Sequence, residues 1–379
     1  MFDPDHLDAI RVSIRQQTER DRHLLDDLRA DVRAHLRGGA AVRPHVATAM
    51  SLVASDGGNN KLIFDPFNIH LVRVVDSLGR QLFLDVISPT SDPDDLYAAH
   101  AHANDPLGSL MSDLGVTSLH DLSPMVPKGE LARDRPELVS PSWVLVYRDL
   151  CEWAVLYHRI CHTEFANHTL LVRDGLLRSK IFRGELFTDM ARRMAERIQA
   201  VRPLKLYLVG IAKHSQVLSR YRLAMALENA LPAGEPRFVR VPRELERKVY
   251  TWPEYARGPE EAEEEGGEAA KYVIGALYLT RFGKSSGDPI WAVDVFWTQT
   301  NADAEVFGYL LADSVEGFPV PYYPRCLQQA HEHAEFVDFD FEILQDTVFD
   351  AARGLVEPGG RHAFDQMRFA PDVANRRYE

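Results

Sequence analysis

Two apolar segments of the chain end in the same pair of residues, an aspartate followed by a glycine. Asp56-Gly57 follows Leu52-Val53-Ala54-Ser55, and Asp174-Gly175 follows Leu171-Val172-Arg173. The apolar residues predict β-strands, which would hold each carboxylate in place while the glycine lets the backbone turn away. Two such carboxylates on neighbouring strands could bind a divalent cation, because such ions take hard oxygen ligands. Either pair alone is more typical of a simple turn, so the prediction depends on both occurring together.

Three other side chains could take part in the same chemistry. Glu152 lies in an apolar segment with helical spacing, where a buried carboxylate needs a partner such as a metal. Lys213 directly follows the apolar run Lys205–Ala212 and could meet a scissile phosphate or pair with one of the carboxylates. The alternatives are a solvated Glu152 at the edge of the helix face and a solvated lysine at a strand end. His331 and His333 are two residues apart on a predicted helix, so at most one of them can face a site.

The elements that would position these residues alternate between strands and helices. The order is a strand, a hairpin, a helix, a strand, a helix, a strand, a second hairpin and a helix, after a polar N-terminal helix at about 5–37. This order predicts an α/β fold in which helices flank a mixed β-sheet. We expect an irregular or loosely helical insertion at 88–140, where Asp, Pro, His and Ser are frequent, and an acidic loop at 255–270. The predicted ranges are 51–55, 68–76 with 81–87, 143–165, 168–173, 187–201, 205–212, 272–282 with 290–298, and a helix from about 325.

Composition excludes several classes of protein. The 379 residues are 45% hydrophobic, which is enough for a large core. The formal charge of −13 does not suggest a DNA-binding protein, but five acids are concentrated in Glu260–Glu265. The three cysteines form no paired motif, which argues against disulfides and a thiolate zinc site. No apolar run approaches the roughly 20 residues of a membrane span, and a cytoplasmic protein is expected. Nucleotide-binding glycine motifs are absent from the sequence.

Taken in order, these segments resemble the NurA family of nucleases, which have an RNase H-like core. The resemblance runs from the N-terminal helix to about residue 346. Its motifs here are Ala54-Ser55-Asp56-Gly57-Gly58, Leu170–Gly175, Val209–Ser215, and Pro321-Tyr322-Tyr323-Pro324 followed by Leu327-Gln328-Gln329-Ala330-His331. It implies an N-terminal helical segment at 1–45, a NurA-like nuclease domain at 46–350 and a C-terminal tail at 351–379.

The resemblance also implies roles for individual residues. Asp56, Glu152 and Asp174 would be acidic ligands of Mn²⁺ or Mg²⁺, with Glu164 as the alternative to Glu152. His331, which follows Ala330 as in the family, would complete the site, and Lys213 would add positive charge at the phosphate. The expected reaction is hydrolysis of phosphodiester bonds in single- or double-stranded DNA, assisted by one or two ions.

The same resemblance implies partners and a process. Members of the family act as dimers with HerA, a hexameric ATPase that moves DNA, so a homodimer and a HerA-type partner are expected. The implied process is end resection at DNA double-strand breaks, with phage defence as a second possibility. Two alternatives stay open: a weakly active or inactive RNase H-like adaptor for a DNA-translocating ATPase, and a metal-dependent hydrolase of small phosphoesters.

Overall fold

The computed structural model describes residues 4–45, 50–64, 67–259, 271–335 and 338–369. Nine strands in these ranges form one mixed sheet, in the order β1-β7-β8-β9-β6-β5-β2-β3-β4. Their bounds are β1 Ala40–Ala41, β2 Ser51–Phe64, β3 Phe67–Asp76, β4 Gln81–Ile87, β5 Thr169–Asp174, β6 Leu206–Ala212, β7 Arg237–Arg240, β8 Gly275–Arg281 and β9 Trp291–Phe296. The predicted mixed sheet flanked by helices is confirmed.

Five of these strands make the part of the sheet that carries the site. β2, β3 and β4 form an antiparallel meander, and β5 and β6 extend the sheet from β2 in parallel. This order, β4-β3-β2-β5-β6, agrees with the RNase H-like core that the family resemblance implied. Both predicted hairpins are confirmed as β3–β4 and β8–β9. Strands β1 and β7 were not predicted, because they are only 2 and 4 residues long.

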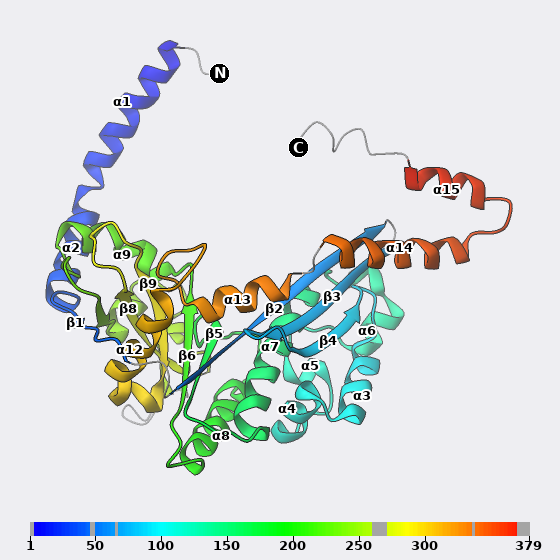
Figure 1. Cartoon of the computed structure of the whole chain (residues 1–379). Coiled ribbons are helices and arrows are strands. Elements are labelled where there is room, and N and C mark those ends of the chain that lie inside the picture. The colour runs from blue at the N-terminus through cyan, green and yellow to red at the C-terminus, as the bar shows by residue number, and fades with distance from the viewer. Residues whose placement is uncertain (1–3, 46–49, 65–66, 260–270, 336–337, 370–379) are drawn as a thin grey trace.

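Helices cover both faces of the sheet (Figure 1). On one face, α7 (Trp143–His162) and α8 (Leu186–Ala200) bury their apolar sides in a core that includes Leu171 and Leu208. On the other face, α12 (Asp303–Ser314) and α13 (Arg325–Ala334) pack over a core that includes Ala54 and Val172. A third core, over the β8–β9 half of the sheet, joins α2 (Arg22–His35) to α9 (Gln216–Leu227).

Strand β2 differs from its prediction in length. It was expected to end at Asp56, but it continues to Phe64. Its first part, Ser51–Ser55, pairs with β5, and the part from Ser55 onward pairs with β3. Asp56 therefore lies within a strand, at the position where the parallel pairing with β5 ends. The two glycines after it do not form a turn, because pairing with β3 keeps the backbone extended.

Residues 88–140, predicted as an irregular or loosely helical insertion, contain four short α-helices and a 3-10 helix, Pro136–Leu138. The polar residues that suggested a loop are helix caps: the side chains of Asp92, Asp105 and Ser118 accept hydrogen bonds from backbone N–H groups of the following turn. Proline occupies the first turn of the first two helices, where its missing N–H costs nothing. The helices are α3 Pro93–Ala103, α4 Pro106–Leu114, α5 Leu119–Leu122 and α6 Gly129–Asp134.

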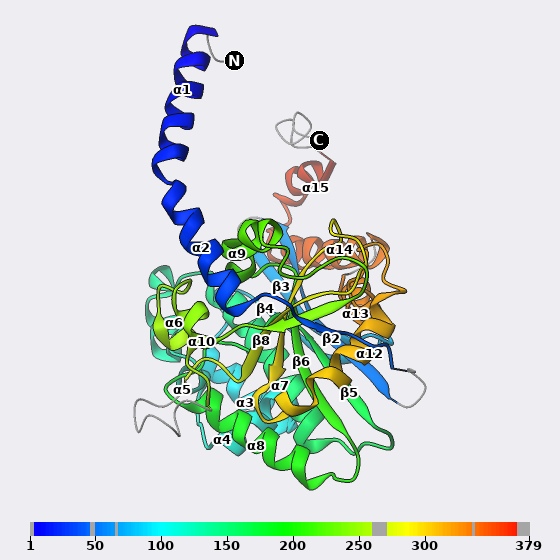
Figure 2. The same ribbon diagram turned by 90° about the vertical axis from the view of Figure 1, so that its left-hand side faces the viewer.

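The two ends of the described chain lie away from the sheet. The predicted N-terminal helix is divided near Asp21 into α1 (Pro4–Arg20) and α2, and α1 projects from the body of the molecule (Figure 2). α14 (Asp338–Leu355) runs across the boundary predicted between 350 and 351, and α15 (Arg361–Phe369) follows it. The acidic run Glu260–Glu265 lies outside the described residues. No helix in the described ranges is both long and apolar enough to cross a membrane.

Candidate metal centre

The alternation of side chains along the strands places both aspartates on one face of the sheet. In β5, Leu170 and Val172 pack in the core beneath α13, whereas Leu171 packs beneath α7. Since side chains alternate between faces, Asp174 points toward α13. Asp56 is two residues beyond Ala54, which belongs to the same core as Val172, and so it points the same way.

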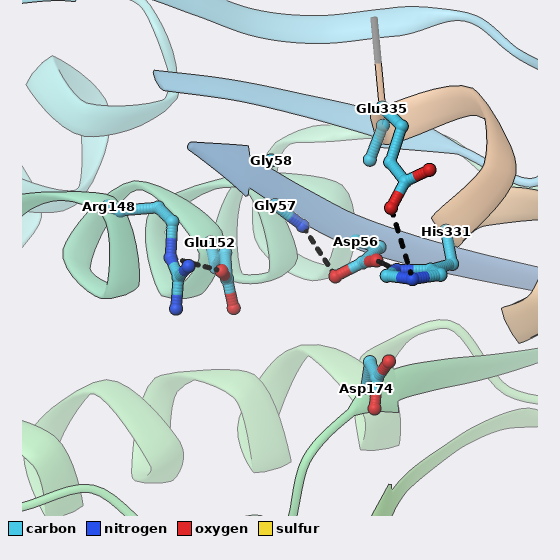
Figure 3. Close-up of a pocket in the computed structure, with 9 residues that line it drawn as sticks. Asp56, Gly57, Gly58, Arg148, Glu152, Asp174, His331 and Glu335 are labelled. Carbon is cyan, nitrogen blue, oxygen red and sulfur yellow. Dashed lines mark hydrogen bonds and ion pairs between the residues drawn. The ribbon is translucent and has the colours of Figure 1, made fainter. Parts of the chain in front are cut away.

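Helix α13 brings a histidine to these two carboxylates. His331 Nδ1 lies 2.8 Å from Asp56 Oδ2. Asp56, Asp174 and His331 each offer one ligand atom, and all three atoms lie within 4.8 Å of one another (Figure 3). His333 points elsewhere, with its ring close to Gly79 in the turn between β3 and β4. The expectation that at most one of the two histidines faces the site agrees with this geometry.

Asp174 has two further partners in the structure. The hydroxyl of Tyr323 donates a hydrogen bond of 3.1 Å to Asp174, and Lys213 Nζ lies 3.3 Å from the other carboxylate oxygen. Lys213 follows β6 and lies 5.3 Å from the centre of the Tyr323 ring. Burial, with the neighbouring Asp174 carboxylate second, raises the pKa of Tyr323 well above its usual value, so the phenol stays protonated and can donate. Lys213 thus pairs with a carboxylate, one of the two arrangements expected for it.

Glu152 approaches the site from the opposite face of the sheet, on α7. Its carboxylate lies against Gly57, where any Cβ atom would collide with it. It forms ion pairs of 3.3 Å with both Arg148 and Arg173. Burial raises the pKa of Glu152, and the charge of Arg173 opposes that rise. Glu152 is not one of the three residues whose ligand atoms cluster within 4.8 Å, although it lines the same pocket.

The pocket between these elements has a volume of about 420 Å³. Figure 3 shows Asp56 between Glu152 on α7 and His331 on α13, with Asp174 facing them from β5. Glu164, the alternative to Glu152, is exposed after the end of α7 and does not line the pocket. The pocket is lined by Asp56, Gly57, Gly58, Arg148, Glu152, Asp174, His331, Ala334 and Glu335.

The donors present fit a divalent cation. Two carboxylates and one imidazole, supplied by three separate elements, offer oxygen and nitrogen ligands to the same small space. Carboxylate oxygens suit Mg²⁺ and Mn²⁺, and a histidine nitrogen is better accepted by a transition metal such as Mn²⁺. The hydrogen bonds to Asp174 from Tyr323 and Lys213 would orient that ligand, as outer partners do in protein metal sites.

Three residues around the site were not singled out from the sequence. Tyr323 is part of the segment Pro321–Pro324, which was noted without a role for this residue. Arg173 directly precedes Asp174 and is the only cation in an otherwise apolar strand, a signal that could have been read as a partner for a buried acid. Arg148 is one helical turn before Glu152, the spacing of an ion pair on one helix face.

Comparison with known proteins gives a likeness in overall structure. No protein-family model and no curated protein matches the sequence. The chain is similar to the crystal structure of the NurA nuclease from Sulfolobus solfataricus, with 14% identity, a TM-score of 0.43, and coverage of 94% of this chain and 99% of that one. It is also similar to a crystal structure of NurA with manganese, at 14% identity, a TM-score of 0.36, and coverage of 91% and 98%.

A third solved structure, of NurA bound to dAMP and manganese, matches at 13% identity and a TM-score of 0.34, with coverage of 90% of this chain and 96% of that one. The resemblance seen in the sequence is therefore found again as a match to NurA structures over about nine tenths of the chain. Identities and TM-scores this low describe an overall likeness, and the function proposed below rests on the residues of this chain.

Proposed function

We propose that this protein is a metal-dependent DNA nuclease of NurA type, which hydrolyses phosphodiester bonds with Mn²⁺ or Mg²⁺. The observation that carries the proposal is the convergence of Asp56, Asp174 and His331. They come from β2, β5 and α13 and lie up to 275 residues apart in the chain, yet their ligand atoms lie within 4.8 Å of one another.

Each residue has a part in the proposed chemistry. Asp56, Asp174 and His331 would hold the ion, which when bound lowers the pKa of a water molecule and polarises the phosphate. Lys213, beside Asp174, would attract the negatively charged phosphate and stabilise charge that develops on it. Tyr323 keeps the Asp174 carboxylate oriented. Glu152 stays a predicted third acidic ligand, held at the edge of the pocket by its two arginines.

The proposal includes partners. DNA is the substrate, and a HerA-type ATPase would supply movement along it, in the end resection of double-strand breaks. A homodimer fits the placement of α1, which projects from the body with Ile10 and Ile14 exposed (Figure 2). An apolar side of a projecting helix is stabilised when a second chain covers it.

One observation favours the alternative of a weakly active adaptor. The carboxylate of Glu152 forms ion pairs with Arg148 and Arg173. If these pairs persist when a metal binds, the pocket offers the metal two carboxylates rather than three. An RNase H-like protein with a reduced ligand set could still bind DNA and a motor while cleaving slowly.

The test is cleavage of single-stranded and duplex DNA with Mn²⁺ by Asp56→Ala and Asp174→Ala variants. We expect each to lose at least about 100-fold in rate, more than the loss usual for residues outside the ligand set. Mn²⁺ binding, measured by calorimetry, should fall in parallel. Asp189→Ala, a half-exposed aspartate paired with Arg192 on α8, is the control and should change neither.

Two outcomes would separate the competing functions. Cleavage by both variants at the rate of the unchanged protein would remove Asp56 and Asp174 from the site. Binding of DNA with no cleavage by the unchanged protein would support the adaptor. A chromogenic phosphodiester tested beside DNA distinguishes a hydrolase of small phosphoesters, because only that activity would prefer the small substrate.

A further inference from the structure

A second cavity opens at the same edge of the sheet as the acidic pocket. Its volume is about 520 Å³. Lys180, on its wall, lies in the segment after β5, and Gln216, also on its wall, begins α9 just after β6. Both cavities therefore lie beyond the carboxyl ends of the parallel strands, where ligands commonly bind in sheets of this kind. The wall is formed by Met125, Lys180, Gln216, Tyr250, Thr251, Trp252, Tyr255 and Tyr272.

Half of the residues on this wall are aromatic. Tyr250, Tyr255 and Tyr272 form a row, with ring centres 5.3 Å apart for the first pair and 6.2 Å for the second. Trp252 stands beside them with 70% of its surface exposed. Tryptophan carries the largest apolar surface of any side chain, so an indole left in water next to a row of phenol rings favours a flat ligand that stacks on it.

Buried ionic contacts hold the row in place. Arg178 forms ion pairs with Asp294 and Glu246 in the interior, and its Nη1 donates a 3.1 Å hydrogen bond to the backbone carbonyl of Tyr255. Its guanidinium carbon lies 5.6 Å from the centre of the Tyr250 ring. These contacts fix the tyrosines before any ligand arrives, which lowers the entropy lost on binding.

Charged residues connect the aromatic cavity to the acidic pocket. Burial raises the pKa of Tyr255, and the charges of Arg178, Asp149 and Arg173 act on it in turn. Arg173 in turn forms ion pairs with Asp149 at 2.7 Å and with Glu152 at 3.3 Å. Glu152 lines the acidic pocket, so the Arg173 cluster lies between the two cavities.

We propose that the aromatic cavity binds an unpaired base of the DNA strand whose phosphodiester bond enters the acidic pocket. The inference rests on the proposed nuclease function and adds a substrate class, a single-stranded segment or frayed end. Aromatic faces stack with any base and so do not select a sequence, and Lys180 supplies a positive charge for the adjoining phosphate. A base within a duplex is already stacked and paired, and is therefore not available to Trp252.

The test is the affinity of the full chain for a fluorescent single-stranded oligonucleotide, measured in EDTA so that cleavage is absent. We expect Trp252→Ala to weaken binding roughly ten-fold, and Lys180→Ala to weaken it by a smaller factor that disappears at high salt. Trp252→Phe should retain most of the affinity, because a phenyl ring still stacks. The control is Leu355→Ala, an exposed apolar residue of α14, which should bind as the unchanged protein does.

The readout separates this inference from the nuclease proposal. If Trp252→Ala binds the oligonucleotide as tightly as the unchanged protein, the cavity is not a base-binding site, whatever the Asp174→Ala variant does in the cleavage assay. Equal weakening of blunt duplex and single-stranded DNA would also overturn it. If Trp252→Ala weakens single-stranded binding alone while the Asp56 and Asp174 variants cleave normally, the base site stands and the metal site is wrong.

Discussion

At the scale of single residues, the site depends on a glycine as much as on its acids. Asp56 points to the α13 face of β2, and Gly57, the next residue, points to the α7 face, where Glu152 lies directly over it. A side chain at this position would occupy the space of the Glu152 carboxylate. Gly57 thus lets acids from both faces of the sheet approach one pocket.

We predict that Gly57→Ala pushes Glu152 away and lowers the cleavage rate about ten-fold, the loss typical when a residue supporting a metal site is disturbed. The melting temperature should change by only a few degrees, because the carboxylate is the end of a flexible side chain that can move. Gly354→Ala, where the new Cβ meets no atom, is the control. Full activity of Gly57→Ala would show that the position of Glu152 does not matter.

Asp174 and Glu152 should also differ in their effect on metal binding. Asp174 belongs to the group of three ligands, whereas Glu152 is bound to Arg148 and Arg173. We predict that Asp174→Asn weakens Mn²⁺ binding more than Glu152→Gln does, as measured by calorimetry or by the electron spin resonance of free Mn²⁺. An equal loss in both variants would place Glu152 among the direct ligands.

The sequence predicted the residues that carry a local pattern and missed those that depend on tertiary contact. Asp56 and Asp174 stand out because each ends an apolar run. Tyr323 is 149 residues from Asp174, and nothing in its neighbours indicates where its hydroxyl points. The cluster around Arg173 joins α7 to β5 and could be inferred only after the two elements had been placed together.

At the scale of elements, a buried histidine joins four of them. His100 of α3 forms a 2.6 Å hydrogen bond to Asp105 before α4, and its other ring nitrogen contacts Tyr147 of α7 at 2.7 Å and Asp85 of β4 at 3.3 Å. Burial alone would lower the pKa of His100, but Asp105 and Asp85 outweigh it and raise the pKa to about 9. Tyr147 belongs to α7, the helix that carries Glu152, so this network also supports the position of α7.

The network should make stability depend on pH in a defined window. Because the pKa of His100 is raised on folding, its contribution is complete below about pH 6.5 and is lost as the pH rises through about 9. The pKa values of Asp85 and Asp105 are lowered despite burial, by hydrogen bonds to His100 among others, so their contribution is lost only in acid.

We predict that His100→Asn lowers the free energy of unfolding by up to about 3 kcal/mol more at pH 6 than at pH 9.5. Denaturant unfolding at several pH values measures the difference. His102→Asn, an exposed histidine on the same helix, is the control and should show no such trend. A constant difference across this pH range would mean that His100 is not charged in the folded protein.

Element prediction was most successful where apolar periodicity is strong and failed where polar residues have structural roles. The strands β5 and β6 and the helix α7 follow from runs of buried residues. The sequence of residues 88–140 did not separate irregular chain from loose helices, because capping aspartates and prolines are also typical of loops. The length of β2 was underestimated because two glycines within a strand are rare. The pairing with β3 that keeps these glycines extended is a tertiary contact, which the local sequence does not reveal.

At the scale of the whole molecule, α1 is the feature that is not explained by a single chain. Its residues are largely exposed, and Ile10 and Ile14 lie one turn apart on one side with 38% and 59% of their surfaces in water. α2, which follows it, is anchored: Val32 and Leu36 are fully buried in the core with α9. The molecule therefore presents a helix that is fixed at one end and uncovered at the other.

We predict that Ile10→Asp with Ile14→Asp converts a dimer to a monomer in light scattering, while the melting temperature measured for the monomer is nearly unchanged. Ala9→Asp with Gln16→Asp adds the same charge to the opposite side of α1 and should leave the dimer intact. If both pairs of substitutions leave the mass unchanged, α1 does not form the dimer contact.

The continuity of β2 has a consequence for variation in this protein. One strand serves two neighbours, β5 over Ser51–Ser55 and β3 beyond it, and Asp56 marks the change of partner. Deleting one residue ahead of Asp56 would slip the strand by one position and turn Asp56 toward α7, with Gly57 toward His331. Homologous chains should therefore tolerate substitutions in this strand far better than insertions or deletions. A change of one residue in the length of the strand moves Asp56 to the other face of the sheet.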